Sequence, residues 1–243
     1  MNRPIVIGSI VGAGLIASAR DRHDADDDAE GIADAETADG PAPAGATSTA
    51  DATRAWVWPL PTWRGYPAVI SDGLGSPRDG GARSHHGVDL DYRAPSKDSL
   101  PEFKRGTADR STGGLFFAPA GVPVLAAADG VIWGVSLSSR GYQITIDHGK
   151  PWATYYQHLA SVRFPDLKRG AGGIRVHGGE PIGIMGNGHN PGQAAPTAFR
   201  HLHFEMWKAG GPAAFVDPAP YLRTARRVAL SSELAAIARS KRT

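Results

Sequence analysis

The sequence predicts a mostly β protein with an antiparallel, jelly-roll-like sheet in a single main domain. Its 31 glycines and 19 prolines favour many turns and short strands over long helices. Several short runs are apolar or alternate apolar and polar residues, as half-buried strands do. A segment with the 3.6-residue period of a helix appears only in the C-terminal tail. Together these observations predict antiparallel β architecture.

Residues 1–20 read as a signal peptide or a short membrane anchor. Arg3 precedes an apolar run over residues 4–16, and small residues follow at Ala17 and Ala19. The run is short for a spanning helix, which needs about 20 residues, so a cleaved leader is favoured over an anchor. The stretch "GAGLIA" matches a loose dinucleotide-binding fingerprint, but no amphipathic helix follows it, so that interpretation is rejected.

Residues 21–55 are predicted to form an acidic, disordered linker. Ten acidic residues and a single basic one, Arg22, lie between Asp21 and Asp51. Almost nothing in this stretch is apolar enough to be buried. The rest of the chain carries a net positive charge, which favours anionic partners such as nucleic acid, acidic lipid or an acidic wall polymer.

The main domain is expected over residues 56–222. The segment "GVPVLAAADGVIWGVSLS" has a turn at Asp129–Gly130 between two apolar runs, which predicts a hairpin. Residues 141–149, "GYQITIDHG", alternate as a half-buried strand does. Two further β-rich runs are residues 151–159, "PWATYYQHL", and 199–207, "FRHLHFEMW".

Three segments stand outside this strand pattern. Residues 92–117 and 187–200 are long polar connections, and long connections in compact domains are usually functional or disordered. Residues 223–243 are predicted to be a basic C-terminal helix or a loose tail. Helical spacing of Leu222, Val228, Leu230, Leu234 and Ile237 leaves both possibilities open.

Two clusters of metal-binding residue types stand out, "SHHGVDLD" and "RHLHFE". The chain has no cysteine, so a zinc site must use histidine and carboxylate ligands. His201 and His203 are two residues apart on a predicted strand, so they point the same way, about 6.6 Å apart. His85 and Asp89 would lie about 13 Å apart on a flat strand and can share an ion only if the chain bends at Gly87. His86 and Asp91 are alternative ligands from this cluster.

Five motifs occur in the order found in a known enzyme family: "HHGVDL", "GVPVLAAADGVI", "YYQHL", "GGEPIGIMGNG" and "RHLHFE". The chain resembles the lysostaphin/LytM-type zinc metallopeptidases, which have the duplicated hybrid motif fold. The resemblance covers roughly residues 56–207 and begins at "WVWPLP". It implies a single catalytic domain with a substrate groove. Both long connections are longer than is usual in the family, and Arg200 stands where Pro or Gly is common.

The resemblance implies a role for each matching residue. His85, Asp89 and His203 correspond to the ligands of one Zn²⁺ ion, which makes His86 the variable residue of the HxGxD motif. His158 and His201 correspond to the histidines that act in catalysis. His148 is expected to be structural, and His177 and His189 to be solvated. Asp147 or Glu205 could orient an imidazole, but a plain position on the strand surface is favoured for each.

The implied activity is that of an exported zinc endopeptidase acting on peptide cross-links of bacterial peptidoglycan. The alternative is a non-catalytic module that binds the wall or activates an amidase, but such relatives typically lose metal ligands and this chain keeps all of them. Nucleic-acid binding is not expected, because the chain has no recognition helix or aromatic platform motif. The expected location is the periplasm, the cell envelope or the medium. The sequence predicts no oligomeric state.

Overall fold

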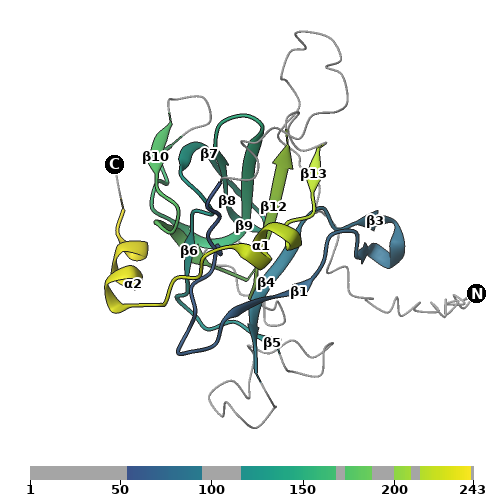
Figure 1. The fold of residues 1–243 in the computed structure, drawn as a ribbon, viewed down its shortest axis with the longest axis horizontal. Coiled ribbons are helices and arrows are strands. Elements are labelled where there is room, and N and C mark those ends of the chain that lie inside the picture. Colours follow the sequence, from purple (N-terminus) through teal and green to yellow (C-terminus); the bar gives the residue numbers. More distant parts are fainter. Residues whose placement is uncertain (1–53, 95–115, 168–172, 188–199, 209–213, 242–243) are drawn as a thin grey trace, which may run out of the picture.

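The computed structural model describes residues 54–94, 116–167, 173–187, 200–208 and 214–241. These residues form an eleven-stranded sheet and a separate two-stranded one, and every strand pairing in both is antiparallel (Figure 1). The predicted mostly β, antiparallel fold is therefore confirmed. The predicted leader, nearly all of the linker and most of both long connections lie outside the described residues. No described helix is long and apolar enough to cross a membrane.

The large sheet has seven strands in one hydrogen-bonded path. In spatial order they are β1 (Ala68–Asp72), β4 (Val88–Arg93), β12 (Leu202–Lys208), β9 (Trp152–Val162), β8 (Gly141–Asp147), β7 (Gly130–Ser138) and β10 (Ile174–Val176). Four strands branch from this path. They are β5 (Phe116–Phe117) on β4, β13 (Phe215–Val216) on β12, β11 (Pro181–Met185) on β9, and β6 (Pro123–Leu125) on β11.

The predicted strands at the centre of the sheet are present. In β8 the side chains of Ile144 and Ile146 are buried and Asp147 is exposed, as the alternation predicts. Strand β12 is buried along nearly its whole length because β4 and β9 flank it on both sides. The "HLH" segment therefore enters the middle of the sheet and not an edge.

The hairpin predicted around Asp129–Gly130 is wrong. Strand β7 pairs with β8 and β10, whereas β6, before the turn, pairs with β11. The residues leading into the turn are already paired elsewhere: Ala126 exchanges backbone hydrogen bonds with Gly179 and Glu180. The Asp129 carboxylate accepts from the backbone N–H of Gly178. The turn therefore carries the chain from one strand pair to another.

Two segments near the ends of the described chain lie side by side. Helix α1 (Ala219–Thr224) is followed by an extended segment, residues 225–230, that runs parallel to residues 57–62. Helix α2 (Ser232–Arg239) then packs against β6 and β11 (Figure 1). It begins at Ser231, whose hydroxyl accepts a hydrogen bond from the Leu234 N–H, a standard N-cap. Val228 and Leu230 are therefore extended, and the helix starts after them.

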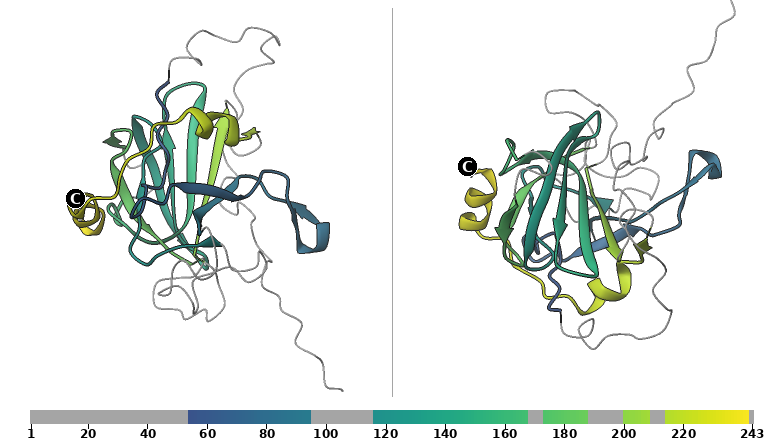
Figure 2. Two further views of the ribbon diagram at one scale, coloured as in Figure 1. Left: turned by 60° about the horizontal axis from the view of Figure 1, so that its bottom comes forward. Right: turned by 90° about the horizontal axis from the view of Figure 1, so that it is seen from above.

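A small arm projects from the body between β1 and β4. It consists of β2 (Pro77–Arg78), the 3₁₀ turn η1 (Asp79–Gly81) and β3 (Arg83–Ser84), and we call residues 77–84 the β2–β3 arm. Figures 1 and 2 show the arm standing away from the sheet, with its base next to the start of β4. The base of the arm therefore lies beside the first histidine cluster.

Candidate metal centre

The pairing of β4 with β12 brings the two histidine clusters together. Asp89 of β4 lies directly opposite His203 of β12 in the antiparallel register. Gly87 makes this approach possible, because a Cβ atom there would collide with the backbone oxygen of Phe204. The chain bends at Gly87, so His85 turns back towards Asp89. The predicted bend at Gly87 is thus present.

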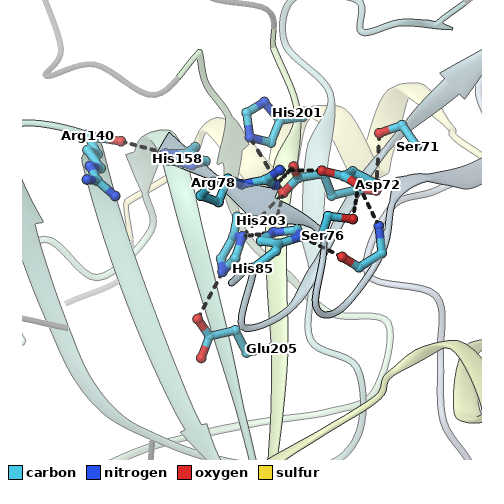
Figure 3. Close-up of polar contacts among 12 residues, drawn as sticks. Ser71, Asp72, Ser76, Arg78, His85, Arg140, His158, His201, His203 and Glu205 are labelled. Atoms are coloured by element: carbon cyan, nitrogen blue, oxygen red, sulfur yellow. Dashed lines mark hydrogen bonds and ion pairs between the residues drawn. The ribbon is translucent and has the colours of Figure 1, made fainter. Parts of the chain in front are cut away.

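Three candidate ligand atoms, from His85, Asp89 and His203, lie close together. Figure 3 shows the His85 and His203 rings next to each other. His85 Nε2 lies 2.8 Å from His203 Nδ1. Asp89 Oδ1 lies 3.1 Å from His85 Nε2 and 3.2 Å from His203 Nδ1. Tetrahedral zinc with bonds of about 2.0–2.1 Å separates its ligand atoms by about 3.3 Å. The spacing of these three atoms is therefore close to that of a zinc site.

Each of the two imidazoles has one nitrogen that points into the cluster and one that points away from it. The hydrogen-bond partner of the outer nitrogen shows which of the two carries the hydrogen. His85 Nδ1 lies 2.9 Å from the carbonyl oxygen of Gly73, and His203 Nε2 lies 2.9 Å from Glu205 Oε1. Both partners are acceptors, so in the neutral rings the outer nitrogens carry the hydrogens. The inner nitrogens then face each other as two lone pairs, an arrangement that requires a positive charge between them. The residues present therefore fit a metal cation.

When no ion is bound, a proton on an inner imidazole nitrogen meets the same demand for positive charge, and that nitrogen then donates to Asp89. Burial alone would lower the pKa of His203, but hydrogen bonds to Asp89 and Glu205 outweigh it and raise that pKa to about 10. Burial would likewise raise the pKa of Asp89. The charge of His201 and hydrogen bonds from His203 and His85 instead hold it well below its usual value. The Asp89 carboxylate is therefore ionised and available as a ligand.

His201 and His158 lie beside this cluster. His201 Nε2 is 3.7 Å from Asp89 Oδ1, and the His201 and His158 rings are 4.7 Å apart between centroids. His158 Nδ1 lies 3.3 Å from the carbonyl oxygen of Arg140. The structure therefore brings together all five residues that the sequence singled out.

His158 owes its position to a bulge in β9. The register of β9 shifts against both β8 and β11 near this residue, and His158 has a positive φ of 67°. Bulges commonly re-aim a side chain, and positive φ is uncommon outside glycine. The bulge lets the His158 ring face His201.

The other sequence candidates lie elsewhere. His86 stacks on Phe215 with ring centroids 4.1 Å apart, and neither it nor Asp91 belongs to the described ligand group. His148 is buried and bonds to the Asp129 carbonyl and the Thr154 hydroxyl, a structural setting. His177 is exposed, and His189 lies outside the described residues.

The expectation of a plain surface position is confirmed for Asp147 and wrong for Glu205. Asp147 is exposed and accepts from the Gly149 N–H. Glu205 is buried, bonds to His203 and accepts from Trp207 Nε1 over 2.6 Å. The signal for Glu205 was present in the sequence, because residues 203, 205 and 207 share one strand face. Arg78, which bonds to Asp89, had no such signal.

Comparison with known proteins finds similarity to peptidases over part of the chain. Residues 109–217 match the model of peptidase family M23, a range that includes His158, His201 and His203 but not His85 or Asp89. An uncharacterized metalloprotease of Buchnera aphidicola is 34% identical over 120 residues, 48% of this chain and 28% of the relative. The cell division protein DipM of Caulobacter vibrioides is 34% identical over 106 residues, 42% of this chain and 15% of DipM. The chain thus spans less than a third of these relatives.

Solved structures to which this chain is similar include two peptidases. The catalytic domain of lysostaphin from Staphylococcus simulans is 24% identical, with 65% of this chain and 92% of that domain covered and a TM-score of 0.42. A zinc-containing peptidase from Vibrio cholerae is 23% identical, with 68% and 39% covered and a TM-score of 0.43. Residues 109–217 thus match peptidase family M23, and the ordered motifs resemble those of the lysostaphin/LytM-type peptidases.

Proposed function

We propose that this chain is an exported zinc endopeptidase that hydrolyses peptide cross-links of bacterial peptidoglycan. One observation carries the proposal: three inward-facing ligand atoms of His85, Asp89 and His203 converge with two further histidines beside them. A non-catalytic module would not require all three ligand residues together with the two neighbouring histidines. The match of residues 109–217 to the model of peptidase family M23 supports the same proposal.

His85 Nε2, Asp89 Oδ1 and His203 Nδ1 would hold the ion. Two neutral imidazoles and one carboxylate are a common ligand set of catalytic zinc, and three protein ligands leave a further position open. Zinc in such a site supplies Lewis acidity, which polarises a peptide carbonyl and makes water easier to deprotonate. Gly73 and Glu205 orient the two imidazoles through their outer nitrogens.

His158 and His201 would handle protons and developing charge. The Arg140 carbonyl can only accept, so it fixes the hydrogen of His158 on Nδ1 and leaves Nε2 to exchange a proton with the substrate. His201 lies between this ring and Asp89 and can donate a hydrogen bond to an oxyanion formed there.

Charge and the N-terminal segment support action on the cell wall. The chain beyond residue 51 is basic, which favours an anionic polymer. The leader-like residues 1–20 support export, and we place the domain in the periplasm, envelope or medium for this reason. A relative named as a cell division protein is consistent with wall remodelling.

The test is mass spectrometry of purified peptidoglycan after incubation with the full zinc-loaded chain. New free amines at one type of cross-link are expected, and they would name the bond. His203→Ala should abolish them, whereas His177→Ala, which replaces an exposed histidine far from the cluster, should not. Intact peptides from several wall types would contradict the proposal and favour a wall-binding module.

A further inference from the structure

The two carboxylate oxygens of Asp89 face different partners. Oδ1 lies within 3.7 Å of nitrogens from His85, His201 and His203. Oδ2 instead accepts a hydrogen bond from Arg78 Nη2 over 2.9 Å. Oδ1 therefore faces the candidate metal position, whereas Oδ2 faces Arg78.

Arg78 is itself held in place at the base of the β2–β3 arm. Its Nη1 bonds to Asp72 Oδ2 over 2.5 Å, so the guanidinium spans two carboxylates from β1 and β4. Asp72 Oδ1 in turn accepts from the Ser76 hydroxyl and, over 2.9 Å, from the Gly73 N–H. Only 18% of the Arg78 side chain is exposed. An arginine that makes two charge-assisted bonds is far better ordered than one in a single surface ion pair.

We propose that Arg78 is a positioning residue that confines Asp89 to single-oxygen binding of the metal ion. A carboxylate can bind a cation through one oxygen or both. If Oδ2 were free, it could take the position that a substrate carbonyl or water must occupy. With Arg78 bonded to Oδ2, the ion keeps three protein ligand atoms and an open position. This inference rests on the metal site of the proposed function, but not on its substrate.

A planar, forked cation is needed for this arrangement. The two guanidinium nitrogens reach Asp72 and Asp89 at the same time, which a lysine ammonium on a flexible stem does less well. The β2–β3 arm therefore contributes to the site, because it carries Arg78, which bridges Asp72 of β1 and Asp89 of β4. A contact that only stabilised the arm would leave the geometry of a bound ion unchanged.

The test is the visible absorption spectrum of the full chain loaded with Co²⁺, because four-coordinate cobalt absorbs more strongly than five-coordinate cobalt. Arg78→Gln is expected to weaken this absorption, since Asp89 can then bind through both oxygens. Zinc affinity should fall about tenfold, the lower range for loss of a partner that orients a ligand. Arg175→Gln makes the same chemical change at an exposed site on β10 and should leave the spectrum unchanged.

A second variant keeps the test decisive if Arg78→Gln does not fold, as judged by circular dichroism. Asp72→Asn leaves Arg78 in the chain but weakens its anchor, and it should shift the spectrum in the same direction by a smaller amount. A folded Arg78→Gln chain, or failing that a folded Asp72→Asn chain, with the wild-type spectrum overturns the proposal, whatever its zinc affinity.

The cobalt spectrum also separates this proposal from the proposed function. A wild-type chain that binds one ion but cleaves no peptidoglycan would refute the function and leave the role of Arg78 standing. A wild-type chain that binds no ion at all would overturn both.

Discussion

His148 lies outside the metal cluster but makes folding sensitive to pH. Burial lowers its pKa to about 4, against about 6.5 in the unfolded chain. Above pH 6.5 the ring is neutral in both states, so its contribution to stability is complete. Between pH 6.5 and 4 the unfolded chain binds a proton that the folded chain excludes, so the free energy of unfolding falls. The loss should reach about 3 kcal/mol near pH 4.

Urea unfolding at several values between pH 7 and 4 measures this effect. His148→Gln should flatten the fall by about the stated amount, because glutamine does not titrate. His177→Gln, at an exposed histidine, should leave the profile as in the wild type. Equal slopes for the wild type and His148→Gln would show that His148 is not the group responsible.

Sequence reasoning was most successful for residues whose spacing alone fixes their direction. His201 and His203 were expected to point the same way because they are two residues apart. The structure places both beside Asp89, although His201 directly precedes β12. Arg78 could not be found in this way. It lies eleven residues before Asp89 and reaches it only because the arm returns to the sheet, a property of the tertiary structure.

Among the elements, the bulge in β9 depends on Gly186, the residue directly after β11. A Cβ atom at Gly186 would lie 2.5 Å from the His158 oxygen and 2.7 Å from the Ala160 nitrogen, both rigid backbone atoms. The Gly186 N–H also donates to that oxygen over 2.7 Å. Gly186 therefore supports the unusual backbone conformation that turns His158 towards His201.

Gly186→Ala should destabilise the chain and disturb catalysis without disturbing metal binding. The added methyl group must push the bulge away, at a cost of about 2 kcal/mol, typical of overpacking. Zinc affinity, measured by competition with a chelator, should stay within about twofold, because the ligands lie on or next to β4 and β12. The rate of peptide cleavage should fall, because the displaced bulge moves the His158 ring. Weaker zinc binding together with unchanged cleavage would contradict this account.

Elements with a clear alternating pattern were predicted well, and elements defined by their partners were not. The strand β8 matches its pattern because one face is buried and the other is not. The hairpin at Asp129–Gly130 failed because the turn signal is local, whereas the backbone groups of Ala126 are paired with distant residues. The residue pattern of a strand does not indicate which distant segment it pairs with, so such pairings could not be predicted.

At the scale of the whole molecule, segments near the two ends of the described chain pair with each other. Residues 225–230 add an extended segment beside residues 57–62, and the Arg227 guanidinium lies 3.9 Å from the centre of the Trp58 ring. Arg227 also donates to the Ala68 carbonyl of β1 over 2.8 Å. This C-terminal segment lies beyond residues 109–217, which match the family model.

Two truncations separate the contribution of this segment from that of helix α2. A chain ending at Leu230 loses only α2, whereas a chain ending at Thr224 also loses the extended segment. The second should be less stable than the first by about 4 kcal/mol. Four backbone hydrogen bonds join the segment to Trp56, Trp58 and Thr62, and each contributes about 1 kcal/mol. The lost cation–π contact with Trp58 would add a little to this difference.

Urea unfolding of the two truncated chains gives the difference directly. Both should retain the far-ultraviolet spectrum of a β protein and bind zinc at low denaturant, because β4, β9 and β12 are intact in both. Unfolding of the shorter chain should begin at lower urea concentration. Equal midpoints would mean that the pairing of the two ends contributes nothing to stability, and that the sheet is held by its central strands alone.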